Sequence, residues 1–167
     1  MGAEYANYAS DMTRSVPVSG KFSERQKDVY NAVLRVKNAA AKMLVPGTIW
    51  ADYHVEVGKL MTKELLTLGL ISKEDVEKED PNWPAYKKYF MHGTSHHMGL
   101  DTHDYGILTE PMEAGMVFTV EPGIYIPDEN LGIRLEDDYL IQESGDPVNL
   151  MKNIPIEIED IEKWMSK

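Results

Sequence analysis

The chain has 167 residues, which suits one domain, and its hydrophobic fraction of 43% is ordinary for a globular protein. It contains no cysteine, so disulfides, thiolate metal sites and cysteine nucleophiles are excluded. A net charge of −11 would repel the phosphate backbone of a nucleic acid. No run of apolar residues is long enough to span a bilayer, and the first residues do not resemble a signal peptide. We therefore expect no nucleic-acid or membrane partner and a cytoplasmic location.

Extended structure and then a helix are predicted for the first quarter of the chain. Residues 4–18 are rich in tyrosine, threonine and valine, which favours an extended segment followed by a turn. Ser23 and Gln26 have the spacing of a capping box, and a helical apolar repeat follows them until Pro46. An opening strand with no preceding neighbour would leave a free edge, so a homo-oligomer that covers this edge is an expectation.

A second helix is predicted from about residue 51 to residue 68, with Gly69 as its stop. Helical spacing predicts that its buried stripe consists of Val55, Leu60, Met61 and Leu65. Ser72 is the expected start of a short third helix, and two prolines mark the segment at 80–84 as a loop.

Short strands are predicted for the second half of the chain. They are expected at residues 116–120, 124–126, 133–135 and 139–141, and a helix is expected at 156–164. Helices that precede strands, rather than alternating with them, favour an α+β arrangement.

The densest group of chemically active side chains is a histidine cluster. Four of the five histidines, His92, His96, His97 and His103, lie within one short segment that also contains glycines. Neutral imidazole is the commonest metal ligand and the usual acid or base near neutral pH. A single histidine would more often be a packed or surface residue, but four together favour a site.

Three carboxylates and one arginine are the other candidates. Glu121 follows a predicted buried strand, where a carboxylate is costly unless it is paired or bound to a cation. On a strand Arg134 and Glu136 would point the same way, which also fits an exposed ion pair. Asp11, taken alone, indicates almost nothing.

Taken together, one aspartate, one histidine and two glutamates make an oxygen-rich set of ligands. Such a set suits Mn²⁺, Co²⁺ or Zn²⁺ with bridging carboxylates, and paired ions of this kind activate a hydrolytic water.

These motifs, in this order, resemble the Xaa-Pro aminopeptidases (aminopeptidase P), which are dinuclear metallopeptidases of the pita-bread fold. The resemblance is carried by three stretches: residues 2–22 around Asp11, the histidine motif at 92–104, and the Arg-Leu-Glu-Asp-Asp run at 134–138. It implies hydrolysis of the N-terminal Xaa-Pro bond of a peptide, with release of the first amino acid, by two divalent ions, of which Mn²⁺ is the first expectation.

The resemblance also implies a role for each site residue. The residues that match its metal ligands are Asp11, His96, Glu121 and Glu136, with Asp11 and Glu136 as the bridging pair. The residues that match its catalytic and substrate-contacting positions are His92, His103, Glu121 and Arg134. His97 stands where the family usually has an apolar or aromatic residue, so no role is assigned to it.

The chain departs from the family at its start. The family has an earlier aspartate ligand, whose position would fall immediately before Met1, and an N-terminal region before that. Residues 1–167 are therefore expected to be the C-terminal portion of a catalytic domain, an incomplete pita-bread fold. We expect this chain to hold one ion more tightly than two, and its activity to be impaired or absent.

Three alternatives remain open. Prolidase, which cuts Xaa-Pro dipeptides, shares the fold and the ligands. Creatinase-like relatives cleave other C–N bonds without a full set of metal ligands. The alternative from another class is a non-catalytic peptide-binding module on the same fold, and the presence of four ligand positions argues against it.

Overall fold

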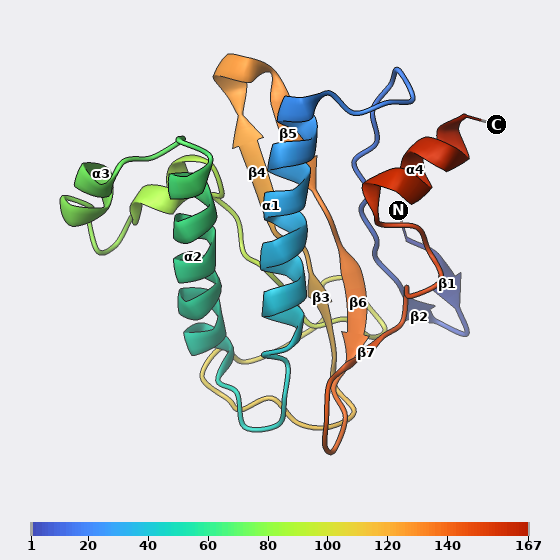
Figure 1. Ribbon diagram of the computed structural model, residues 1–167. Coiled ribbons are helices and arrows are strands. Elements are labelled where there is room, and N and C mark those ends of the chain that lie inside the picture. The colour runs from blue at the N-terminus through green and yellow to red at the C-terminus, as the bar shows by residue number, and fades with distance from the viewer. Residues whose placement is uncertain (1, 167) are drawn as a thin grey trace.

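A computed structural model describes residues 2–166, in which two long helices lie side by side in front of an antiparallel sheet (Figure 1). The helices of this part of the chain are α1 (Glu24–Ala41), α2 (Trp50–Thr67), α3 (Lys73–Glu77), α4 (Ile158–Met165) and the short 3₁₀ helices η1 (Ala85–Lys88) and η2 (Pro127–Glu129). Its strands are β1 (Glu4–Tyr5), β2 (Tyr8–Ala9), β3 (Val117–Val120), β4 (Gly123–Ile126), β5 (Leu131–Arg134), β6 (Asp137–Leu140) and β7 (Val148–Asn149). The α+β prediction is confirmed.

The local signals in the sequence set the ends of the helices. The Ser23 hydroxyl accepts a hydrogen bond from the Gln26 amide, and the Gln26 side chain accepts one from the Ser23 amide, so the predicted capping box starts α1. Ser72 starts α3 in the same way. Gly69 takes a φ of +69°, a left-handed conformation that suits glycine, directly after α2.

The predicted buried stripe of α2 was partly wrong. Met61 and Leu65 are fully buried, but Val55 is 57% exposed. The buried face of α2 instead contains Tyr53 and Val57. The helix presents this face to α1, so tertiary packing rather than the apolar count decided which stripe is buried.

The centre of the sheet is one long antiparallel hairpin that is interrupted halfway. β3 pairs with β6, and β4 pairs with β5. The register is the same on both sides of the interruption, because Val120 lies opposite Asp137 and Gly123 lies opposite Arg134. β7 extends the sheet beyond β6.

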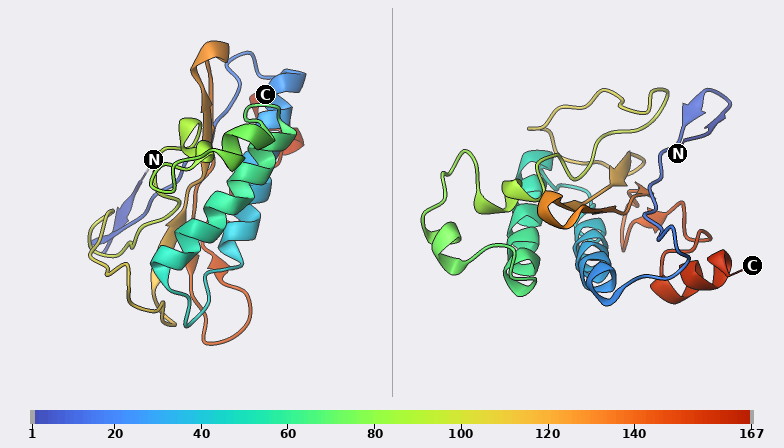
Figure 2. Two further views of the ribbon diagram at one scale, coloured as in Figure 1. Left: turned by 90° about the vertical axis from the view of Figure 1, so that its left-hand side faces the viewer. Right: turned by 90° about the horizontal axis from the view of Figure 1, so that it is seen from above.

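The two faces of this sheet are covered by different material. α1 and α2 cover one face, whereas the loop at residues 91–115 and the β1–β2 hairpin lie on the other (Figure 2). α4 lies beside the start of the chain, where the Phe22 amide donates to the side chain of Glu162. The sheet is therefore a partition between a helical layer and a layer of loops.

The opening residues form a two-stranded hairpin rather than the unpaired strand that the sequence predicted. β1 and β2 pair with each other, and the turn between them contains Ala6 and Asn7, both with positive φ. The Ala9 amide donates to the Gly99 carbonyl, which ties the hairpin to the histidine loop. Across residues 2–166, none of the helices is both long enough and apolar enough to cross a membrane.

Candidate metal centre

The interruption of the central hairpin brings Glu121 and Glu136 together. The continuous register places these two residues opposite each other, and directly opposed residues of an antiparallel pair project to the same side of the sheet. Pro122 has no amide hydrogen, so the regular ladder breaks there and only the Leu135 amide donates across, to the Pro122 carbonyl. The amides of the two glutamates bond outward instead, Glu121 to the Thr94 carbonyl and Glu136 to the Thr13 carbonyl.

These outward bonds add an irregular segment on each side of the hairpin. Residues 94–98 run along β3, where the Thr119 amide and hydroxyl bond the backbone of His96, and His97 forms an isolated bridge with Phe118. On the other side Thr13 forms an isolated bridge with Glu136. The histidine motif and the segment around Asp11 thus lie against neighbouring backbones.

The four predicted metal ligands converge at this place. Ligand atoms of Asp11, His96 and Glu136 all lie within 4.8 Å of one another. His96 Nε2 lies 3.7 Å from Glu121 Oε1. Two donor atoms bound to one ion at about 2.0–2.2 Å are about 3–4 Å apart, so a small closure of the group would suit a divalent ion.

The donor atoms of this group are oriented but not satisfied. The Nδ1–H of His96 donates to the His97 carbonyl at 3.0 Å, which leaves Nε2 with its lone pair facing the carboxylates. His96 Nε2 and Glu136 Oε1 are buried and have no hydrogen-bond partner within residues 2–166. Buried polar atoms without partners are rare, so a cation fits the residues present.

Electrostatic repulsion among these carboxylates also favours a bound cation. Burial, and then the neighbouring Glu136 carboxylate, raise the pKa of Glu121 to about 7. Burial is also the main cause of the raised pKa of Glu136. These carboxylates are costly when ionised side by side, and a divalent cation would remove that cost.

Arg134 reaches the site through Thr13. The Thr13 hydroxyl donates to Glu136 Oε2 at 2.6 Å and accepts from Arg134 Nε at 3.2 Å. Arg134 and Glu136 therefore meet on one side, as predicted, although Glu136 itself lies just outside the regular strands. The threonine orients one glutamate oxygen and leaves the other for a ligand.

The two outer histidines of the motif have different surroundings. Burial lowers the pKa of His92, so its neutral ring donates from Nδ1 to the Gly93 carbonyl and accepts the Tyr125 hydroxyl at Nε2, 2.7 Å away. His103 is exposed, and its ring centroid lies 4.3 Å from that of His96. His103 thus lies beside the proposed ligand His96, whereas His92 is held by Tyr125 of β4.

His97, which received no role, packs against apolar neighbours instead of facing the carboxylates. Its ring lies 4.1 Å from that of Phe118 and 5.2 Å from that of Trp50, measured between centroids. These residues line a small cavity of about 130 Å³ beneath the loop at 105–112. An apolar or aromatic residue would fit this position equally well.

Sequence reasoning missed Thr13 and Asp138. Asp138 accepts a hydrogen bond from the Asp11 amide at 3.2 Å, and burial raises its pKa to about 7. Both residues stand two positions from a predicted ligand, Thr13 from Asp11 and Asp138 from Glu136, so strand alternation could have placed them on the same face.

Comparisons with known proteins agree with this geometry. Residues 1–143 match the model of metallopeptidase family M24. The chain is 40% identical to the Xaa-Pro aminopeptidase of Haemophilus influenzae and 39% identical to that of Escherichia coli. These alignments cover 99% and 98% of this chain but only 40% and 39% of the relatives, so the chain spans about two fifths of their length.

Solved structures show the same fold. A putative aminopeptidase P from Bacillus anthracis superposes with a TM-score of 0.85 at 38% identity, over 96% of this chain and 36% of that one. Zinc-substituted Escherichia coli aminopeptidase P in complex with product gives a TM-score of 0.85 at 37% identity, over 98% of this chain and 39% of that one. The chain thus has the fold of the matching part of these pita-bread enzymes, and it belongs to metallopeptidase family M24.

Proposed function

We propose that this chain carries the metal centre of an Xaa-Pro aminopeptidase, which hydrolyses the bond before a proline at the second position and releases the first amino acid. The convergence of Asp11, His96, Glu121 and Glu136, with unsatisfied donor atoms at its middle, is the observation that carries the proposal. The similarity to Xaa-Pro aminopeptidases of two bacteria supports the choice of substrate.

The proposed centre holds divalent ions, two in the whole enzyme, with Mn²⁺ preferred over Co²⁺ or Zn²⁺. Asp11 and Glu136 would bridge the pair, and His96 and Glu121 would complete the shell of the first ion. Three of the ligands are carboxylates and one is an imidazole, a set that suits Mn²⁺. Because these four residues suffice for one ion, we propose that this chain binds one ion more tightly than a second.

Residues around the centre would bind the substrate and move its protons. A divalent ion held here would lower the pKa of a water molecule and stabilise the charge that develops on the scissile carbonyl oxygen. Glu121 would carry a proton from that water to the leaving proline nitrogen. His92 and His103 would hold the substrate on either side of the scissile bond, and Arg134 would keep Glu136 oriented through Thr13.

The partner of this centre is a peptide rather than a nucleic acid or a membrane. The acidic charge of the chain suits the free amino terminus of such a peptide. A cytoplasmic location, and self-association into a homo-oligomer, are part of the proposal.

Peptide hydrolysis in excess Mn²⁺ tests the proposal. The wild-type chain is expected to release the first residue of an Xaa-Pro-Xaa tripeptide at an impaired rate, and Glu121→Gln, which keeps the shape but not the charge, is expected to release none. A preference for the Xaa-Pro dipeptide would favour prolidase instead. Mn²⁺ binding without cleavage of either peptide would contradict a catalytic role for the chain and favour a peptide-binding module.

A further inference from the structure

Arg14 joins three segments of the chain behind the metal centre. Its Nη1 donates to the Thr13 carbonyl at 2.9 Å and to the Glu136 carbonyl at 2.7 Å. Its Nη2 bonds Asp137 Oδ1 at 2.5 Å, and its Nε donates to the Pro155 carbonyl at 2.9 Å. The side chain is only 10% exposed, so water does not compete strongly for these donors.

The shape of the guanidinium explains why these contacts require arginine. Its planar fork offers five N–H donors in fixed directions, whereas the ammonium of lysine is a point charge that cannot bind four separated acceptors. Two of the acceptors, the carbonyls of Thr13 and Glu136, belong to the two backbones that carry the proposed bridging ligands. The fork thus ties the segment with Asp11 to the segment with Glu136.

Other contacts also hold the segment around Asp11. The Thr13 hydroxyl donates to Glu136, and Ser15 bonds both the amide and the carbonyl of Arg134. The Glu136 amide donates to the Thr13 carbonyl, and the Asp11 amide donates to Asp138. Asp137, in contrast, is also bonded by the buried ammonium of Lys37 at 2.5 Å and by the side chain of Asn149. Loss of the fork would remove the charge-assisted bonds from this segment to the Glu136 carbonyl and to Asp137, while Asp137 keeps Lys37 as a cationic partner.

We propose that Arg14 is a positioning residue that holds Asp11 and Glu136 at the separation that a metal ion requires. This inference rests on the proposed metal centre. Arg14 does not contact the metal-binding atoms themselves; it acts on the two backbones that carry them. Residues that orient metal ligands in this way typically change metal affinity by about tenfold to a hundredfold when they are replaced.

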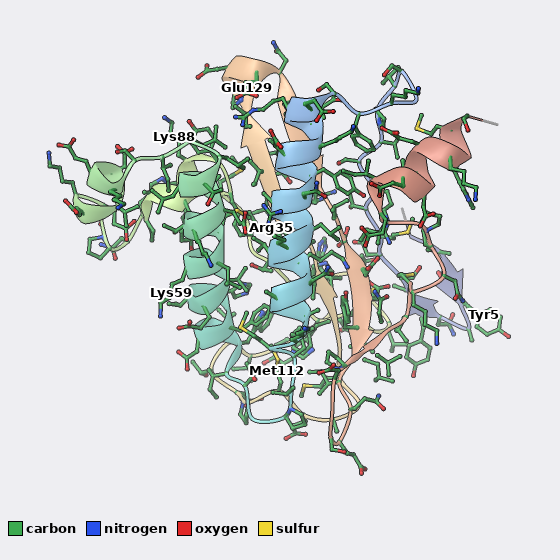
Figure 3. The ribbon with its side chains drawn as sticks, viewed as in Figure 1. Tyr5, Arg35, Lys59, Lys88, Met112 and Glu129 are labelled. Atoms are coloured by element: carbon green, nitrogen blue, oxygen red, sulfur yellow. The ribbon has the colours of Figure 1, made fainter. Side chains whose placement is uncertain are left out.

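Calorimetric titration with Mn²⁺ tests this inference in the full chain. Arg14→Lys is expected to weaken binding by about tenfold to a hundredfold relative to the wild type. The matched control is Arg35→Lys, because Arg35 makes a forked contact with Glu64 within the helical layer (Figure 3), which covers the other face of the sheet (Figure 2). The control is expected to bind Mn²⁺ like the wild type.

The outcomes separate the inference from the proposed function. Equal affinities of Arg14→Lys and the wild type would overturn the positioning role while leaving the metal centre intact. A wild-type chain that binds no Mn²⁺ would overturn the metal centre and the inference with it. A merely structural arginine would lower the melting temperature of the metal-free chain but leave the affinity of the folded chain unchanged, which would also overturn the positioning role.

A second variant keeps the test decisive if Arg14→Lys does not fold. Asp137→Asn removes the charge that pairs with the Arg14 guanidinium but keeps the size of the side chain. The backbone carbonyls that accept from Arg14 stay in place. This variant is expected to bind Mn²⁺ at least severalfold more weakly than the wild type. The loss should be smaller than the one expected for Arg14→Lys. Unchanged affinity in this variant would overturn the positioning role.

Discussion

The two faces of the central sheet use opposite kinds of side chain. The face under the helices is closed with apolar residues that are fully buried, such as Val33, Val57, Met61, Leu65 and Ile124. The opposite face gathers Asp11, His96, Glu121, Glu136 and Asp138 on the side of the loop at residues 91–115 and the β1–β2 hairpin (Figure 2). The first face stabilises the fold by burying apolar side chains. The second destabilises it in part, because carboxylates are held close together.

A buried ion pair joins the helical layer to the strand that also carries Asp138 of the acidic face. Lys37 lies in α1 among apolar neighbours, is 1% exposed, and bonds Asp137 at 2.5 Å and the Tyr139 hydroxyl at 2.9 Å. Asp137 stands beside Glu136, at the point where β6 begins. The helical layer therefore supplies a buried cation to Asp137, the sequence neighbour of Glu136, so a substitution of Lys37 is the first test of how far the two faces depend on each other.

Lys37→Met is expected to have the largest effect on stability. It leaves Asp137 buried with one cationic partner fewer, and breaking a buried ion pair typically costs about 3–5 kcal/mol. The free energy of unfolding in urea, measured without metal, checks this value. A loss below about 1 kcal/mol would show that Arg14 alone neutralises Asp137 and that the two layers are independent.

Glu121→Gln is expected to stabilise the metal-free chain. The folded-state pKa of about 7 lies above the ordinary value of 4.5, so the folded chain binds this proton more tightly than the unfolded chain does. Wild-type stability should therefore fall as pH rises from about 4.5 through 7, by roughly 1–3 kcal/mol. The variant has no such proton, and it should exceed the wild type at about pH 8 and differ less at about pH 5.

Urea unfolding of both chains across this pH range is the measurement. Asp138, whose pKa is also raised to about 7 by burial, titrates in the same direction and remains in both chains, so the difference between them isolates Glu121. Parallel pH profiles would contradict an electrostatic cost at this position.

Ser23→Ala is expected to have a smaller effect than the substitutions of Lys37 and Glu121. It removes one half of the capping box of α1, and losing such a cap typically costs about 1 kcal/mol. Ser72→Ala removes the same cap from α3, which is short and has no buried residue, so its effect on global unfolding should be smaller still. Thermal melts of the two variants would test this order.

Much of the fold could be read from local signals. The capping boxes at Ser23 and Ser72, the stop at Gly69 and the strand near 117–120 are all determined by neighbouring residues. The exposure of Val55 could not be predicted, because a helix with apolar residues on more than one side is oriented by its packing partner. The pairing of β1 with β2 likewise depends on a tight turn that the composition did not indicate.

The ligands of the centre were predicted from their motifs, but not from contacts in space. No local pattern shows that Glu121 and Glu136 face each other, because this depends on the register of a hairpin that continues across Pro122. The supporting contacts of Thr13 and Arg14 also join residues far apart in the sequence. Strand alternation could have added Thr13 and Asp138, whereas Arg14 could be found only in the structure.

The central claim is that the acidic face of the sheet is a metal centre, and the dependence of unfolding on Mn²⁺ tests it most directly. At about pH 8 the free energy of unfolding of the wild type should rise by about 1.4 kcal/mol for each tenfold increase in Mn²⁺ above the dissociation constant. His96→Ala should show no such rise. A wild-type stability that stays flat with Mn²⁺, or that rises equally in His96→Ala, would contradict the claim.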